Sequence, residues 1–369
     1  MDACFKAFDK DEDLSLNINE FTELLKSLFR NEKGKPYPID AYMCNELFMI
    51  FNQSGDGSMS KAEFAYCWNN WVKKIVRPVS AFIVVDVQND FISGSLSISK
   101  CSAGHNGEEV VPAINKLVET VPFNVYAYSL DWHPADHLSF VDNVHLRKFH
   151  ASSKIQDPSR VKEMDTVVFE GPPMTEQRLW PRHCVQNSWG AEFHKDLKVP
   201  KGSIFVYKGL DSFVESYSTF YDNLKQHETK LKSELFKREV MDVYVCGLAT
   251  DVCVASTAFH AQELGFRTIL IDDCSRGIDM EAINEAKAQI IEDHGLVVNS
   301  SEVKALVQGR DRRLELGYAW AIQCRKNILY PPKNRNSRYN PVKDENETQG
   351  SDPASQSLTN SNTVVAANA

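Results

Sequence analysis

The sequence predicts an α/β protein: an open, mostly parallel sheet with helices on both faces, preceded by a small all-α region. From about residue 79 to about residue 325, short apolar runs rich in β-branched and aromatic residues alternate with amphipathic stretches of helical period. Runs that are apolar throughout are typical of parallel strands covered on both faces. Two acidic loops between helical segments set residues 1–77 apart from this pattern.

Composition and charge narrow the classes of function. The chain has 369 residues, of which 43% are hydrophobic, so two or three domains with apolar cores are expected. The formal net charge of −9 argues against a nucleic-acid partner, and no apolar run is long enough to span a membrane. Nine scattered cysteines, and an N-terminus without an apolar signal core, favour an intracellular, cytoplasmic location, with the nucleus left open.

The N-terminal region contains two twelve-residue stretches with oxygen-bearing side chains at the spacing of calcium-binding EF-hand loops. In the first, Leu14 replaces the usual turn glycine; the second supplies only two carboxylates, which weakens the expected affinity. The predicted calcium ligands are Asp9, Asp11, Asp13, Ser15 and Glu20 in the first loop, and Asn52, Ser54, Asp56, Ser58 and Glu63 in the second. The first loop is slightly favoured, and a degenerate pair retained for packing or docking is the alternative.

Six apolar runs predict the buried parallel strands of the sheet. They lie at residues 81–85, 125–128, 166–169, 204–207, 243–245 and 268–271. Helical patterns at 110–120, 255–264 and 280–293 fall between them, and the stretch 221–241 is expected to form a further helix. Open α/β sheets hold their sites at the carboxyl ends of the strands, so polar residues at these ends are candidates for function.

Three such residues could perform nucleophilic catalysis. Asp86 follows the first run, Lys208 follows the fourth, and Cys253 lies near the start of the helix after the fifth, where N–H groups stabilise a thiolate. Taken singly, the acid could be a helix cap and the lysine a solvated strand end. Taken together, an acid, a lysine and a thiol suit attack on an amide or ester carbonyl. Cys246 ends a strand and is expected to be buried as a small hydrophobe.

A second group of residues predicts a metal site. Asp131 and His133 are two residues apart, so on an extended chain their side chains face the same side. His183 lies in a loop bounded by proline and glycine, where a surface histidine is the plainer interpretation. Two histidines and one aspartate that leave positions open predict a catalytic divalent metal. His137 is an additional candidate ligand.

Five segments resemble motifs of the nicotinamidase branch of the isochorismatase-like cysteine hydrolases. They span about residues 80 to 300 and occur in the order that the family has. They are VVDVQNDFISGSL, DWHPADHLSF, WPRHCVQNSWG, VYKG and GLATDVCVASTA. The resemblance implies a catalytic triad of Asp86, Lys208 and Cys253. It also implies zinc, or else iron or manganese, held by Asp131, His133 and His183, with His137 a ligand in some relatives.

The resemblance further implies how the substrate is held. A cis peptide is expected between Leu248 and Ala249, and the backbone N–H groups of Ala249 and Cys253 would form an oxyanion hole. Phe91 and Trp180 match aromatic residues that wall the substrate ring in relatives, and Tyr217 is expected to join them. Val252 stands where some relatives carry an aromatic residue, which leaves the fine shape of the pocket open.

The implied reaction is metal-dependent hydrolysis of nicotinamide to nicotinate and ammonia through a cysteine thioester, in NAD salvage. The alternatives are another small-amide hydrolase of the same superfamily, or a calcium-regulated binding protein with an inert hydrolase domain. Residues 1–77 are expected to form the EF-hand pair, 78–328 the hydrolase domain, and 329–369 a disordered tail with too little apolar surface to fold. The sequence leaves a homo-oligomer open.

Overall fold

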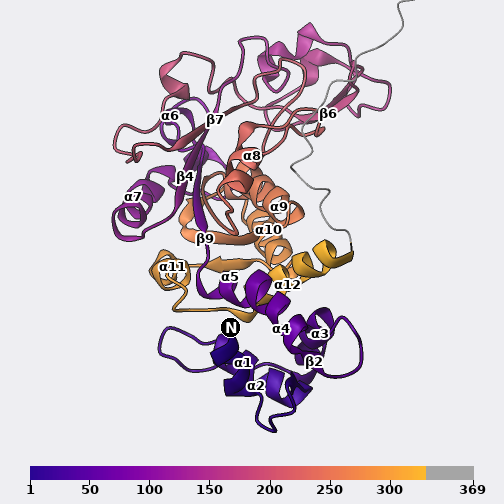
Figure 1. Ribbon diagram of the computed structural model, residues 1–369. Coiled ribbons are helices and arrows are strands. Elements are labelled where there is room, and N and C mark those ends of the chain that lie inside the picture. Colours follow the sequence, from indigo (N-terminus) through magenta and orange to yellow (C-terminus); the bar gives the residue numbers. More distant parts are fainter. Residues whose placement is uncertain (330–369) are drawn as a thin grey trace, which may run out of the picture. The chain divides into compact units, whose positions relative to one another are not determined.

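The computed structural model describes residues 1–329, and its centre is a six-stranded parallel sheet (Figure 1). The strands are β3 (Ser80–Val85), β4 (Val125–Asp131), β7 (Ile204–Lys208), β8 (Asp242–Leu248), β9 (Arg267–Arg276) and β10 (Leu296–Val298). Their order across the sheet is β10-β9-β8-β3-β4-β7, and every neighbouring pair is parallel. The predicted open parallel α/β sheet is therefore confirmed.

The chain leaves the middle of this sheet in two directions. From β3 it proceeds through β4 to the edge strand β7, and it then returns to β8 on the other side of β3 and continues to β9 and β10. The connections that follow β3 and β8 therefore diverge, although the two strands are neighbours. The carboxyl ends of such a pair are where open α/β sheets bind their ligands.

Successive side chains of each strand face opposite sides of the sheet and build two cores. Phe82 and Val84 belong to one core, and Ala81 and Ile83 belong to the other. The first core is covered by α7 (Val110–Thr120) and α11 (Ser300–Val307). The second is covered by α8 (Lys230–Lys237), α9 (Ala255–Glu263) and α10 (Met280–Glu292). The predicted helices at 110–120, 255–264 and 280–293 are confirmed, because α7, α9 and α10 match them closely.

The prediction of a parallel strand at 166–169 is wrong. This segment is β5 (Thr166–Phe169), which pairs antiparallel with β6 (Thr175–Arg178) in a separate two-stranded sheet. Of its four residues only Val167 and Phe169 are buried, so one side of the hairpin is solvated. Gly171, at a φ of 85°, and the two prolines after it turn the chain back on itself.

The helix expected over 221–241 is shorter than predicted, since α8 is the only helical segment there. The preceding residues form turns instead, because the Asp222 carboxylate accepts hydrogen bonds from the backbone N–H groups of Leu224, Gln226 and His227. Local bonds of this kind compete with the helix ladder.

The N-terminal region is an EF-hand pair. Its helices are α1 (Asp2–Phe8), α2 (Ile18–Leu28), α3 (Ala41–Phe51), α4 (Lys61–Cys67), a π-helical turn (Trp68–Val72) and α5 (Lys73–Val76). The two loops are joined by an antiparallel pair of short strands, β1 (Ser15–Leu16) and β2 (Met59–Ser60). Capping boxes, in which Glu20 and Glu63 reach back to Asn17 and Ser60, begin α2 and α4.

The last described helix, α12 (Leu314–Leu329), packs into the core of the EF-hand pair. Its Ala321 and Cys324 are buried in one cluster with Phe21 and Phe48. The expected boundaries place most of this helix in the hydrolase domain, and its packing joins it to both regions, because its Leu316 lies in the first core of the sheet. The predicted disordered tail, apart from Leu329, lies outside the described residues.

Short helical elements complete the described chain. They are α6 (Asn89–Ile92) and 3-10 turns at Ile98–Lys100, Gly107–Glu109, Val141–Leu146, Pro158–Arg160 and Trp189–Ala191, with a second π-helical turn at Thr250–Val254. None of the helices in residues 1–329 combines the length and apolar character that a membrane span requires.

A buried ion pair where β8 and β9 begin gives a test of the fold. Asp242 and Arg267 face each other in the sheet register, and both are at most 3% exposed. We expect Arg267→Met to lower the free energy of unfolding by about 3–5 kcal/mol, because it leaves a carboxylate buried without its partner. Urea unfolding measures the change. The double variant Asp242→Leu/Arg267→Met should recover most of the loss, and a double variant as unstable as the single one would contradict this account.

Candidate active site

Four neighbouring strands bring four polar side chains together at their carboxyl ends: two carboxylates, a lysine and a thiol. Asp86 follows β3, Asp131 ends β4, and Lys208 ends β7. Cys253 follows β8, in the π-helical turn that leads into α9. All four side chains are buried, so the plainer interpretation of Lys208 as a solvated strand end is wrong.

The Lys208 ammonium group connects the other three residues. Its Nζ lies 2.8 Å from Asp86 Oδ2 and 3.4 Å from Cys253 Sγ, and it forms an ion pair with Asp131. It also donates to the carbonyl of Ser216 at 3.1 Å. Burial opposes the positive charge, but Asp131 and Asp86 raise the pKa of Lys208 well above its usual value. The lysine is therefore a fixed cation beside the thiol.

Asp86 is placed to exchange a proton near neutral pH. Burial raises the pKa of Asp86 to about 6, although Lys208 opposes this shift. Ser129 Oγ donates to its Oδ1 at 2.7 Å. The residue has a φ of 49°, a left-handed conformation that is uncommon outside glycine and recurs at functional positions.

Cys253 lies in contact range of this acid. One polar atom each from Asp86, Asp131 and Cys253 lie within 4.8 Å of one another. Burial raises the pKa of the Cys253 thiol well above its usual value, and Lys208 only partly opposes the rise. The helix start was expected to stabilise a thiolate, but burial is the largest influence on the pKa of this thiol. The thiol needs a base, and Asp86 is the neighbouring group with a suitable pKa.

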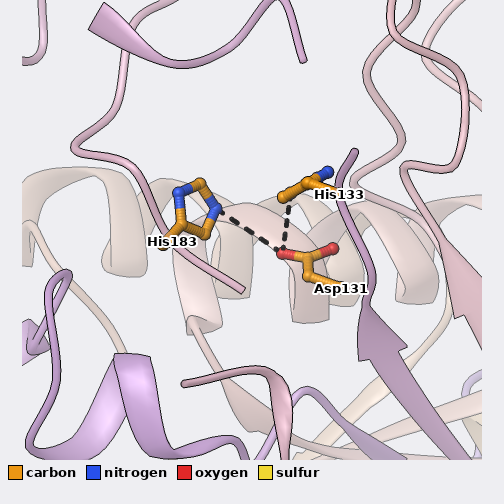
Figure 2. Close-up of side chains that lie close together, drawn as sticks. All are labelled: Asp131, His133 and His183. Carbon is orange, nitrogen blue, oxygen red and sulfur yellow. Dashed lines mark ion pairs between the residues drawn. The ribbon is translucent and has the colours of Figure 1, made fainter. Parts of the chain in front are cut away.

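The two histidines of the predicted metal site point toward the same aspartate (Figure 2). Asp131 Oδ2 lies 3.7 Å from His133 Nε2 and 3.9 Å from His183 Nε2. The Nδ1 atoms of His133 and His183 lie 3.0 and 2.7 Å from the carbonyl oxygens of Gly209 and Pro181. A carbonyl only accepts, so each Nδ1 carries a proton, and in the neutral ring each Nε2 directs its lone pair toward Asp131.

These residues fit a divalent metal ion. The Nε2 atom of His133 is buried and has no hydrogen-bond partner. Burial opposes charge on this ring, but Glu215 and Asp131 raise the pKa of His133, so its surroundings favour a positive charge at that atom. Burial lowers the pKa of His183 to about 4, so this ring is neutral near pH 7. Burial also disfavours charge on Asp131, but Lys208 and His133 hold its pKa below the usual range. Two imidazoles and one carboxylate, each oriented by a second contact, are a donor set that zinc, iron or manganese accepts.

His137 lies behind this set. Its ring stacks on His133 at a centroid distance of 4.1 Å, and its Nδ1 lies 2.7 Å from Ser139 Oγ. It clusters with His133 and Glu215, whereas Asp131, His133 and His183 form a separate group. Glu215 was not predicted from the sequence, where no motif marks it, yet it is 2% exposed and lines the pocket over Cys253.

A small pocket over Cys253 is walled mainly by apolar side chains. The predicted ring-wall residues Phe91, Trp180 and Tyr217 all line it, and Trp180 Nε1 donates to the Tyr217 hydroxyl at 3.3 Å. Val252, the departure from the family pattern, lines it as well. The pocket also contains three aliphatic side chains that were not predicted: Leu96, Ile98 and Ile278.

The bend before Cys253, the candidate nucleophile, has the backbone conformation that was expected. The peptide between Leu248 and Ala249 is cis, as predicted, and Ala249 lines the same pocket as Cys253. Cys246 is fully buried, which confirms that it fills space in the core. The oxyanion role of the Ala249 and Cys253 N–H groups stays a prediction.

The two EF-hand loops differ in their capacity for a cation. Carboxylate oxygens of Asp9, Asp11 and Asp13 lie within 4.8 Å of one another, and Asp9 Oδ1 is buried without a partner. Leu14 adopts a φ of 69°, the conformation usually left to glycine at this position. Among the described residues, the second loop forms no comparable group of carboxylates. The geometry therefore favours the first loop as the calcium site.

Comparisons with known proteins agree with both regions. The isochorismatase domain family matches residues 144–303, and the EF-hand domain pair matches residues 1–67. A nicotinamidase of Acinetobacter baylyi is 35% identical over 201 residues, which cover 54% of this chain and 82% of that protein. A nicotinamidase of Schizosaccharomyces pombe is 37% identical over 207 residues, covering 56% of this chain and 86% of that protein.

Solved structures show the same relationship. The yeast nicotinamidase is 33% identical, with a TM-score of 0.51 and coverage of 60% of this chain and 99% of that one. A nicotinamidase and pyrazinamidase of Acinetobacter baumanii is 32% identical, with a TM-score of 0.51 and coverage of 61% and 98%. The order of motifs, the parallel sheet and these relatives lead to one conclusion: the chain belongs to the nicotinamidase family of isochorismatase-like hydrolases and carries an EF-hand pair at its N-terminus.

Proposed function

We propose that this protein is a nicotinamidase, which hydrolyses nicotinamide to nicotinate and ammonia. The observation that carries the proposal is the contact of the Lys208 ammonium with Asp86, Asp131 and Cys253. It joins a thiol, a base and a metal donor set beneath one small aromatic pocket. The relatives named nicotinamidase support the choice of substrate, and one solved relative, the yeast enzyme, is bound to nicotinaldehyde.

The first half of the reaction forms a thioester. The Asp86 carboxylate takes the proton of the Cys253 thiol, and the thiolate attacks the carboxamide carbon. The backbone N–H groups of Ala249 and Cys253 stabilise the resulting oxyanion, and Lys208 stabilises negative charge beside it. When the carbon–nitrogen bond breaks, protonated Asp86 returns its proton to the leaving nitrogen, and ammonia departs.

The second half releases the acid. Asp86, again a carboxylate, takes a proton from a water molecule that attacks the thioester carbon. The carbon–sulfur bond then breaks, the thiolate regains the proton from Asp86, and nicotinic acid leaves and ionises to nicotinate. One residue thus serves as base and acid in turn, which suits a carboxyl group whose pKa is about 6.

Substrate orientation is assigned to the metal donors and the aromatic walls. Asp131, His133 and His183 would hold zinc, iron or manganese, with His137 behind them. Such an ion, held by these residues, would supply Lewis acidity toward the pyridine nitrogen. The aromatic side chains that line the pocket hold the ring, which directs the carboxamide toward Cys253.

The first EF-hand loop is proposed to bind calcium. Three clustered aspartates, one of them with a buried and unpartnered oxygen, support this assignment. A role in NAD salvage and an intracellular location follow from the substrate and the free cysteines, and both remain proposals. Two other functions are weighed against this one: hydrolysis of a different small amide, and a binding protein with an inert domain. The buried base, lysine and thiol argue against the inert domain.

Substitution of the nucleophile tests the reaction. We expect purified Cys253→Ala to release ammonia from nicotinamide at least about 10³-fold more slowly than the wild type, because Cys253 is the one thiol among the described residues that lines the pocket. Cys246→Ala is the control, since it removes a buried thiol from the same strand and turn. Assays with pyrazinamide and other small amides identify the preferred substrate. Turnover by Cys253→Ala at a rate near that of the wild type would overturn the thioester scheme.

The pKa of Asp86 predicts a pH dependence. Only the carboxylate can accept the thiol proton, so activity is present above the pKa and is lost as the pH falls through about 6. We expect kcat/KM for nicotinamide to decrease about tenfold per pH unit below this value. Circular dichroism at each pH verifies that the protein stays folded. A profile that is level from about pH 7 to pH 4 would rule out Asp86 as the base.

Substitution of a proposed metal ligand tests the donor set. We expect His183→Ala to lower the affinity for the active-site metal by more than about 10- to 100-fold, the loss that follows removal of a group that only orients a ligand, because His183 is one of three proposed protein ligands. Metal content after dialysis is measured by atomic emission, beside nicotinamide turnover. His145→Ala, an exposed histidine, should retain metal and activity like the wild type. Full metal retention by His183→Ala would exclude this residue as a ligand.

A further inference from the structure

The EF-hand pair and helix α12 hold each other through two reciprocal hydrogen bonds. Trp71, fully buried in the π-helical turn after α4, donates its indole N–H to the carbonyl of Gly317 at 2.8 Å. In return, Trp320 of α12 donates its indole N–H to the carbonyl of Asn70 at 2.7 Å. Each indole thus bonds to the backbone of the partner element, which fixes the register between them.

The packing between these elements leaves no space at Gly317. A Cβ atom added there would clash with two ring atoms of Phe29, which follows α2 and is fully buried. Ala321 is buried in the same apolar cluster as Phe21 of the first hand and Phe48 of the second. A groove formed by both hands of an EF-hand pair is where such pairs hold amphipathic target helices. In this protein a helix of the same chain packs against apolar residues of both hands.

The other side of α12 faces the hydrolase region, at the end of the sheet away from the active site. The Gln323 side chain lies so close to Gly265 that a Cβ there would be 2.6 Å from it, and the ring of Tyr318 lies 5.0 Å from that of His294. Gly265 and His294 precede β9 and β10, so both lie at the amino ends of the strands. The catalytic residues lie at the carboxyl ends.

We propose that α12 is a built-in target helix of the EF-hand pair. Calcium bound in the first loop then strengthens the docking of α12 on the pair, without changing turnover. The inference rests on the proposed calcium site. Leu16 within the first loop and Phe21 just after it belong to the same core as Ala321 and Cys324. An ion that orders the loop therefore also orders the surface on which α12 rests. By linkage, docking of α12 must strengthen calcium binding by the factor by which calcium strengthens docking.

The test is calcium titration of the full chain by calorimetry, after calcium is removed and the active-site metal is verified by atomic emission. Gly317→Ala forces α12 away from Phe29, and we expect it to weaken calcium binding at least about fivefold although it lies outside both loops. Trp320→Phe keeps an aromatic ring but loses the bond to Asn70, and should weaken calcium binding in the same direction. Asn327→Ala, exposed on the same helix, should bind calcium within about twofold of the wild type.

Thermal unfolding and kcat/KM for nicotinamide are measured on the same samples. Calcium should raise the Tm of the wild type and change kcat/KM by less than about twofold, because α12 contacts the end of the sheet opposite the site. Wild-type calcium affinity in both Gly317→Ala and Trp320→Phe would overturn the coupling but leave the calcium site standing. Absence of calcium binding by the wild type would overturn the calcium site and the coupling with it. A larger calcium effect on kcat/KM would overturn the claim that turnover is unaffected.

Discussion

The buried ammonium group of Lys208 is the interaction on which the site depends. Two carboxylates, Asp86 and Asp131, and one thiol converge at the carboxyl ends of adjacent strands, where water is largely excluded. Without a cation between them, two ionised carboxylates could not stay buried so close together. Lys208 contacts both, and it lies 3.4 Å from Cys253 Sγ. One positive charge thereby stabilises the proposed base Asp86, the proposed metal ligand Asp131 and any thiolate that forms at Cys253.

The two carboxylates are placed for different roles, although Lys208 contacts both of them. Asp131 is held ionised by Lys208 and by the neighbouring histidines, which suits the metal ligand that we propose it to be. Asp86 has its pKa raised to about 6 by burial, as suits a residue that gains and loses a proton in each cycle. Pairs of acids whose environments separate their pKa values are a recurring basis for acid–base catalysis. Here the separation comes from position: Asp131 lies beside His133 and His183, whereas Asp86 accepts from the neutral Ser129 hydroxyl.

The topology of the sheet explains why these groups meet. β3 and β8 are neighbours in the sheet, although the chain passes through β4 and β7 on its way from one to the other. Their onward connections diverge, so the carboxyl ends of both strands stay open to a ligand. Asp86 and Cys253 follow these two strands, and β4 and β7 add Asp131 and Lys208 from one side. The contacts of α12 with the hydrolase region lie at the amino ends of the strands, so they and the candidate active site are at opposite ends of one sheet.

Much of this arrangement was predictable from local sequence. Apolar runs identified five of the six strands of the sheet, and helical periods identified α7, α9 and α10, whereas β10 and α11 were not predicted. Five ordered motifs identified the family. The pattern failed at 166–169, because four apolar residues look the same in a buried strand and in a hairpin; the turn at Gly171 decides which forms. It failed at 221–229 because side-chain bonds from Asp222 displace the helix there. Glu215 was missed because no spacing rule marks a buried acid whose partners are distant in the sequence.

The sequence by itself determined the residue types of the site and their order along the chain. Only the tertiary structure decided their protonation, since burial raises the pKa of Cys253 and opposes the effect of a helix start. The tertiary structure also decided the partner of the EF-hand pair, because Trp71 and Gly317 are 246 residues apart and meet only after folding. The physical reason is common to both: desolvation and long-range contacts depend on what surrounds a group in space, which neighbours in the sequence do not define.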